Sequence, residues 1–103
     1  MFPMSAKEVP MELSTGAFVR SAAGHDKNGY FFILREEGEY IYLVDGKCRR
    51  LNCPKKKKKK HVEALLWEKH SPGVNIRENK SVTDEEIKHF IRCFKREEQV
   101  VRR

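Results

Sequence analysis

The longest run of identical side chains in this 103-residue sequence is six consecutive lysines, Lys55–Lys60. Nine of the 22 lysine and arginine residues lie between Gly46 and Val62, in a segment that contains no acid, so the other 13 face 15 acidic residues. The excess behind the formal net charge of +7 therefore comes from one short segment. Such a concentration is typical of a surface that binds a polyanion, either a nucleic acid or an anionic membrane.

Lysine and arginine side chains bind nucleic acid by neutralising phosphates, which releases condensed counterions. We expect residues 54–61 to form a solvated basic loop that contributes affinity rather than sequence specificity. The alternative is a run that only helps solubility. The residues of this segment that we assign to RNA contact are Lys47, Arg49, Arg50, Lys55, Lys56, Lys57, Lys58, Lys59, Lys60 and His61.

Cysteine and histidine side chains could in principle bind a metal. Four residues separate Cys48 from Cys53, and His89 and Cys93 are spaced i, i+4 on a predicted helix. Structural zinc sites favour closer Cys-x-x-Cys pairs, so we predict free thiols, no metal and no cofactor. An odd number of cysteines without disulfide-like spacing also indicates a reducing compartment.

Catalysis would need a nucleophile with a base, paired carboxylates in a pocket or a glycine loop that ends in Gly-Lys-Ser/Thr. The sequence shows none of these patterns, so we predict a protein that is not an enzyme and has no small-molecule substrate. No segment has the length of a signal peptide's apolar core or of a membrane span. We therefore expect a cytoplasmic protein and no membrane partner, since no hydrophobic anchor accompanies the lysines.

The elements that position these residues are mostly short β-prone runs. After a flexible leader over residues 1–12, strands are expected at Gly16–Ala23, Tyr30–Arg35, Tyr40–Val44 and Lys47–Asn52. His61–Trp67 is either a last strand, which we favour, or a helical turn. The dipeptide Asp45-Gly46 predicts a tight hairpin between the third and fourth of these strands. Five short strands bury their apolar face best by closing into a small barrel.

A barrel of this size needs most of its aromatic residues for the core. On alternating strands Phe31 and Ile33 share one face, and their neighbours in the chain share the other. We expect at most Tyr30, and Tyr40 or Tyr42, to be exposed for stacking on RNA bases.

The last part of the chain predicts a linker over residues 68–82 and an amphipathic helix over residues 83–101. Thr83 and Glu86 have the spacing of a capping box. An apolar stripe follows at i, i+3, i+4 and i+7 spacing, made of Ile87, Phe90, Ile91 and Phe94. This stripe must pack either on the barrel or on a partner.

The stretch from Gly16 to Leu34 (GAFVRSAAGHDKNGYFFIL) resembles a KOW motif, in which a strand, a Gly-x-Asp-x-x-Gly type loop and a second strand follow one another. Together with Leu43-Val-Asp-Gly46 and Arg49-Arg-Leu51, the sequence resembles the KOW-bearing archaeal and eukaryotic large-subunit ribosomal proteins and their small bacterial relatives. The resemblance implies a mainly β fold, an SH3-like barrel over residues 13–67, with RNA as ligand and association with the ribosome.

Carried onto this sequence, the resemblance makes Gly24 and Gly29 the residues that shape the loop. The residues in and beside the loop that we assign to RNA contact are Arg20, His25, Asp26, Lys27, Asn28 and Tyr30. The expected partners are ribosomal RNA and ribosomal proteins. The alternative is an adaptor of the transcription or translation machinery that binds proteins through the barrel and the helix.

Overall fold

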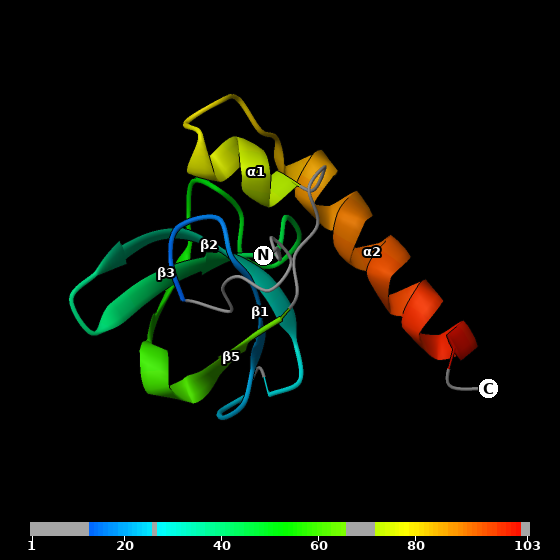
Figure 1. Ribbon diagram of the computed structural model, residues 1–103, viewed down its shortest axis with the longest axis horizontal. Coiled ribbons are helices and arrows are strands. Elements are labelled where there is room, and N and C mark those ends of the chain that lie inside the picture. The colour runs from blue at the N-terminus through cyan, green and yellow to red at the C-terminus, as the bar shows by residue number, and fades with distance from the viewer. Residues whose placement is uncertain (1–12, 26, 66–71, 102–103) are drawn as a thin grey trace, which may run out of the picture.

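The computed structural model describes residues 13–25, 27–65 and 72–101. The described chain is mainly β, with a five-stranded antiparallel sheet and two α-helices (Figure 1). The elements in chain order are β1 (Phe18–Ser21), β2 (Tyr30–Glu37), β3 (Tyr40–Val44), β4 (Lys55–Lys58), the 3₁₀-helix η2 (Lys59–His61), β5 (Val62–Ala64), α1 (Pro72–Arg77) and α2 (Asp84–Val101).

The sheet is open, with the strand order β4-β3-β2-β1-β5, so β4 and β5 form its two edges. The four pairings are all antiparallel, which makes β4 and β5 run in the same direction. Consecutive parallel strands need a crossover of a dozen or more residues to lie side by side, and the three residues Lys59–His61 are too few. The closed barrel predicted from the sequence is therefore not confirmed. The short connection still requires the sheet to curl strongly.

Adjacent residues of the strands pack on opposite faces of this curled sheet. On β1, Val19 belongs to the inner cluster and Phe18 to the outer one, and both side chains are fully buried. The inner face is therefore the one that carries Val19, and the outer face is the one that carries Phe18. The inner cluster consists of Ala17, Val19, Phe31, Ile33, Ile41, Leu43 and Val62, with Leu13 against it.

Helix α2 covers the outer face of β1 and β2. The rings of Phe90 and Phe94 meet the ring of Phe18 edge to face, with centroid distances of 5.3 and 4.9 Å. Such pairs add about 0.5–1.5 kcal/mol to the burial of each ring. Ile87 and Ile91 are buried in the same cluster. The predicted stripe thus packs on the sheet, with Phe90 and Phe94 partly buried.

The N-terminus of α2 has the predicted capping box. The Glu86 amide donates to Thr83 Oγ1 over 3.2 Å, and the Thr83 amide donates to Glu86 Oε1 over 3.0 Å. These bonds satisfy two of the amides that a helix start leaves without intrahelical partners. The helix predicted from spacing alone is confirmed within one residue at its start.

The predicted strand Lys47–Asn52 and its tight hairpin at Asp45-Gly46 are wrong. Instead, β3 pairs with β4, and residues 45–54 form a loop between them. Asp45 Oδ1 accepts hydrogen bonds from the amides of Lys47 and Arg49, which ties the chain into a local turn. The two-residue hairpin turn lies one connection earlier, where Glu37 pairs with Tyr40 around Gly38.

The lysine run is not a solvated loop, because Lys55–Lys58 is the edge strand β4 and Lys59–His61 is the 3₁₀-helix. Lysine is depleted in strands, and identical residues show no alternation, so the sequence carries no strand signal here. The lysines form a strand because they pair with β3, where Ile41 lies opposite Lys57 and Leu43 lies opposite Lys55.

The predicted linker over residues 68–82 contains a helix, α1, at Pro72–Arg77. Proline suits a helix start because its ring fixes the required φ. Gly73 lets this helix approach the turn before β1, since a Cβ on Gly73 would lie 2.2 Å from the Gly16 carbonyl oxygen. The predicted leader, residues 1–12, and residues 66–71 lie outside the described residues. Within the described chain, no helix is both long and apolar enough to cross a membrane.

The β3–β4 loop docks on α2 through Gly46. Gly46 and Gly38 both have a positive φ, of 78° and 62°. A Cβ on Gly46 would lie 2.2 Å from the Asp84 carbonyl oxygen and 2.8 Å from the Lys88 amide, whereas a Cβ on Gly38 meets nothing within 4 Å.

Gly38→Ala should therefore lower the free energy of unfolding by about 1–2 kcal/mol, from backbone strain alone. Gly46→Ala should lower it by about 1–3 kcal/mol more, because the helix must move away. Urea denaturation of both variants measures the difference. Equal losses would show that the loop does not brace the helix.

Candidate nucleic-acid interface

The loop between β1 and β2 and the loop between β3 and β4 lie at the same end of the sheet, because both follow from the antiparallel pairing of β1, β2 and β3. An open cleft of about 400 Å³ lies between them. Its lining residues are His25, Lys27, Asn28, Gly29, Phe31, Asp45, Cys48, Arg49 and Lys55. The cleft thus brings together two segments of the predicted site that lie apart in the sequence, one around Lys27 and one around Arg49.

Backbone hydrogen bonds fix the β1–β2 loop. The Lys27 amide donates to the Gly24 carbonyl over 3.1 Å, and the Asn28 amide donates to the Ser21 carbonyl over 2.8 Å. Gly24 has a φ of 88°, as its role in shaping the loop requires. The second left-handed position is Asn28, with a φ of 72°, and not Gly29. Asparagine tolerates this conformation better than most residues.

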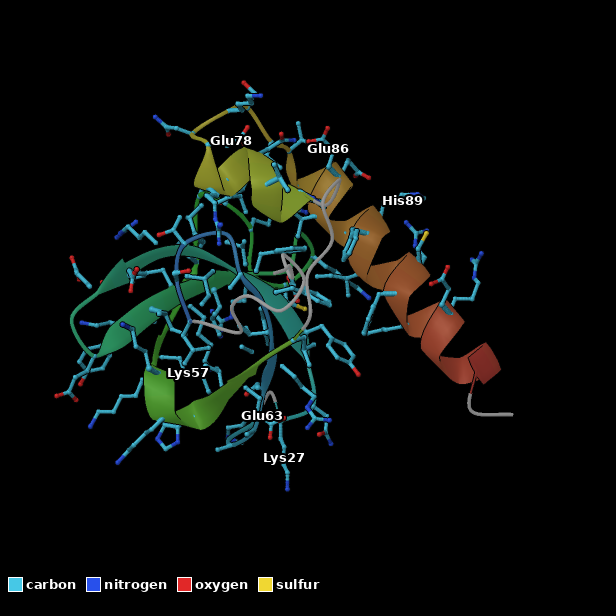
Figure 2. All side chains as sticks on the ribbon, in the orientation of Figure 1. Lys27, Lys57, Glu63, Glu78, Glu86 and His89 are labelled. Carbon is cyan, nitrogen blue, oxygen red and sulfur yellow. The ribbon has the colours of Figure 1, made fainter. Side chains whose placement is uncertain are left out.

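The loop holds its predicted contact residues outward. His25, Lys27 and Asn28 are exposed, and Figure 2 shows Lys27 pointing out of the molecule at the end far from Glu86 and His89 on α2. Asp26 lies outside the described residues. The loop therefore presents a cation and hydrogen-bonding groups to whatever enters the cleft.

The opposite wall of the cleft comes from the β3–β4 loop. The amides of Asp45 and Gly46 both donate to the Arg49 carbonyl, over 2.8 and 3.1 Å. With the two bonds to the Asp45 carboxylate described above, they clamp the backbone of Arg49 beside the cleft. The Asp45 carboxylate, which lines the cleft, thus accepts hydrogen bonds from two amides of its own loop. Lys47 and Arg50, in the same loop, are exposed.

The lysines of β4 divide between the two faces of the sheet. Lys55 lines the cleft, while Lys57, on the same face, is 9% exposed. The Lys57 ammonium donates to the Ala23 carbonyl over 3.0 Å, which ties the edge strand to the end of β1. Lys56 and Lys58 lie on the outer face, opposite Tyr42 and Tyr40. Lys57 was assigned to RNA contact from the sequence, but in the structure its ammonium group braces the sheet.

The rest of the run lies in or beside η2, beyond the end of β4. Lys59 pairs with Glu36 at 3.0 Å, and Lys60 is exposed. His61 is partly exposed, and its carbonyl accepts a hydrogen bond from the Ala22 amide. These residues are not in the lining of the cleft.

Two other predicted contact residues are engaged elsewhere. Arg20 forms an ion pair with Glu63 of β5, at 2.5 Å. The Tyr30 ring packs between Phe18 and Phe94, with centroid distances of 5.9 and 5.1 Å. Tyr30 is partly buried and therefore belongs to the contact between the sheet and α2.

The three cysteines are free thiols. Cys48 and Cys53 are exposed on the β3–β4 loop, and Cys93 of α2 has its sulfur 3.6 Å from His89 Nε2. The part of the chain that the structure describes brings no three His, Cys, Asp or Glu side chains together in a way that would hold a metal ion.

Sequence reasoning missed Arg35, which lies over the ring of Tyr42 with its Cζ 4.0 Å from the ring centroid. The cause is a β-bulge: Ile33 pairs with Leu43, but Arg35 pairs with Tyr42. The extra residue at the bulge places Arg35 on the outer face, whereas strict alternation from Ile33 would place it on the inner face. A bulge in a continuous apolar run leaves no signal in the sequence.

No protein-family model matches the chain, and no curated protein matches it.

The bracing role of Lys57 is testable against a neighbour from the same run. Lys57→Met keeps the aliphatic stem but removes the donor to Ala23, so the free energy of unfolding should fall by about 1 kcal/mol or more. Lys60→Met, at an exposed position, should change it by less than about 0.5 kcal/mol. Urea denaturation monitored by circular dichroism gives both values. A Lys57 variant as stable as the Lys60 variant would contradict the bracing role.

Proposed function

We propose that this protein binds RNA, with the cleft between the β1–β2 and β3–β4 loops as the principal site. The observation that carries the proposal is the meeting of separately predicted segments at one cleft, lined by His25, Lys27, Arg49 and Lys55. Asp45, the acid in that lining, accepts two backbone amides. The volume falls in the range of sites that bind small molecules or parts of larger ones, and its charge suits phosphate.

The same proposal includes the finer assignment of the fold. A curled antiparallel sheet whose edges are joined by a 3₁₀-helix supports an SH3-like barrel of the KOW type, and the β1–β2 loop is the segment that resembles the KOW loop. On that resemblance we propose ribosomal RNA as the ligand. The adaptor hypothesis has less support from the helix, because Ile87 and Ile91 are buried against the sheet and Phe90 and Phe94 are partly buried there.

Binding at the cleft can be separated from attraction by net charge. Arg49→Gln with Lys55→Gln removes two cations from the cleft, and Lys95→Gln with Arg96→Gln removes the same two residue types from exposed positions on α2. The cleft variant should lose affinity for a structured ribosomal RNA fragment, and its log–log salt slope should fall by about 2. The α2 variant should keep both.

A salt titration of binding for the wild type and the two variants makes this measurement. Circular dichroism controls for folding, because Lys55 pairs opposite Leu43 in β4. Equal losses in the two variants would leave only a general charge effect and would contradict the cleft. Undiminished affinity in both variants would show that Arg49 and Lys55 are not the source of binding.

The β1–β2 loop should contribute selectivity, because its exposed side chains can reach base edges or bent backbone while phosphate contacts only position the RNA. We expect His25→Ala, Lys27→Ala and Asn28→Gly together to lower the preference for the ribosomal fragment over a random RNA competitor by about tenfold, the value of one or two good contacts. Glycine at position 28 preserves the left-handed backbone. Competition binding measures the ratio. An unchanged ratio would assign selectivity to another surface.

A further inference from the structure

Helix α2 leaves part of the outer face of the sheet uncovered. On β3, Val44 is fully buried in the cluster beneath α2, but Tyr42 and Tyr40, the next outer-face residues, are partly exposed. Figure 1 shows the β2–β3 hairpin reaching away from α2. The uncovered part is a small area of β2, β3 and β4 with two tyrosine rings at its centre.

Cations lie against both rings. The Arg35 guanidinium carbon is 4.0 Å from the Tyr42 ring centroid. The ammonium groups of Lys56 and Lys58 are 4.6 and 5.9 Å from the Tyr40 centroid. The strand register places these side chains together, because Lys56 is opposite Tyr42, Lys58 is opposite Tyr40, and the bulge brings Arg35 opposite Tyr42. We call Arg35, Tyr40, Tyr42, Lys56 and Lys58 the outer platform.

Acidic residues lie beside the outer platform as well. The Tyr42 hydroxyl donates to Glu37 Oε1 over 3.0 Å, and Glu36 is paired with Lys59. The three cations of the outer platform outnumber the one carboxylate that bonds to it, Glu37, which leaves an excess of positive charge on the platform itself. That excess disfavours a basic partner and favours an anionic one.

Edge-strand protection explains part of this arrangement, because lysines on an edge strand discourage pairing with another sheet. Charged side chains alone would protect the edge strand, so this purpose does not account for the two aromatic rings. Rings in contact with cations are suited to a nucleotide, because a base stacks on a tyrosine ring or a guanidinium plane while an ammonium group neutralises the adjacent phosphate.

We propose that the outer platform is a second RNA site, which binds single-stranded nucleotides by stacking on Tyr40, Tyr42 and the Arg35 guanidinium. Lys55 of β4 lines the cleft and its neighbour Lys56 lies on the outer platform, so an RNA strand that leaves the cleft can pass over this edge to the platform. The inference rests on the proposed RNA binding and adds the kind of RNA: a structured element with an unpaired extension.

The probes are a single-stranded oligouridine of about ten nucleotides, within the site sizes of such surfaces, and an abasic oligonucleotide of the same length and charge. The wild type should bind the oligouridine more tightly than the abasic strand. NMR signals of the Tyr40 and Tyr42 rings should shift upfield with the oligouridine alone, because base stacking adds a ring current. This readout requires no variant, so it does not depend on how a variant folds.

Tyr40→Leu with Tyr42→Leu keeps apolar bulk on the strand and removes both rings. Its affinity for the oligouridine should fall about 5- to 100-fold, to that of the abasic strand. Tyr42→Phe, the matched control, loses the hydroxyl bond to Glu37 and keeps the ring, so it should retain the preference for bases. Glu37→Gln should strengthen binding to both strands, since it removes the carboxylate from the platform.

The outcomes separate this inference from the proposed function. Equal binding of oligouridine and abasic strand by the wild type, or a base preference that survives loss of both rings, overturns the platform while binding of the structured fragment at the cleft stands. Failure to bind any RNA overturns both. Competition by polyglutamate as strong as by oligouridine would indicate an acidic protein as the occupant and would also overturn the platform.

Discussion

Three residues, Lys59–His61, join the two opposite edges of the sheet, and this constraint determines much of the architecture. The strands must curl until the end of β4 comes near the start of β5. The curl creates a closed-in inner face, where the side chains from Ala17 to Val62 pack together, and lets the Lys57 ammonium reach the Ala23 carbonyl at the end of β1. It also sets the two loops of the cleft at one end of a rigid support, where loop residues are best placed for binding.

The lysine run has a different meaning as a strand than as a loop. Along a strand, side chains alternate between the faces, so one run of a single residue type supplies Lys55 to the cleft, Lys57 to the interior and Lys56 with Lys58 to the outer face. In a solvated loop the same lysines would have no fixed alternation between the two faces of the sheet. The functional assignments for the run therefore differ residue by residue, and a block replacement of all six lysines would mix a folding defect with any loss of binding.

The sequence predicts the parts of this structure whose cause is local. The capping box of Thr83 and Glu86 and the spacing of Ile87 to Phe94 define α2 without reference to the rest of the chain, and the aromatic runs locate β2 and β3. Tertiary contacts decide what was missed. Asp45-Gly46 has the residues of a tight hairpin, but Asp45 binds the amides of its own loop, and Gly46 lies against the α2 backbone. The bulge that delivers Arg35 to Tyr42 and the strand character of the lysines likewise depend on a pairing partner.

Stability and the proposed binding use opposite parts of the same sheet. The outer face of β1 and β2 is covered by α2 through the rings of Phe18, Phe90 and Phe94, which makes the helix part of the core rather than an accessory. The cations of the cleft and the outer platform belong to the two cleft loops, to β2 and to β4, and none of them is part of the apolar cluster beneath α2. Because lysine and arginine at a packed interface would carry a desolvation cost, this separation lets a domain of this size concentrate positive charge at one edge while a continuous apolar contact at the other side holds the fold.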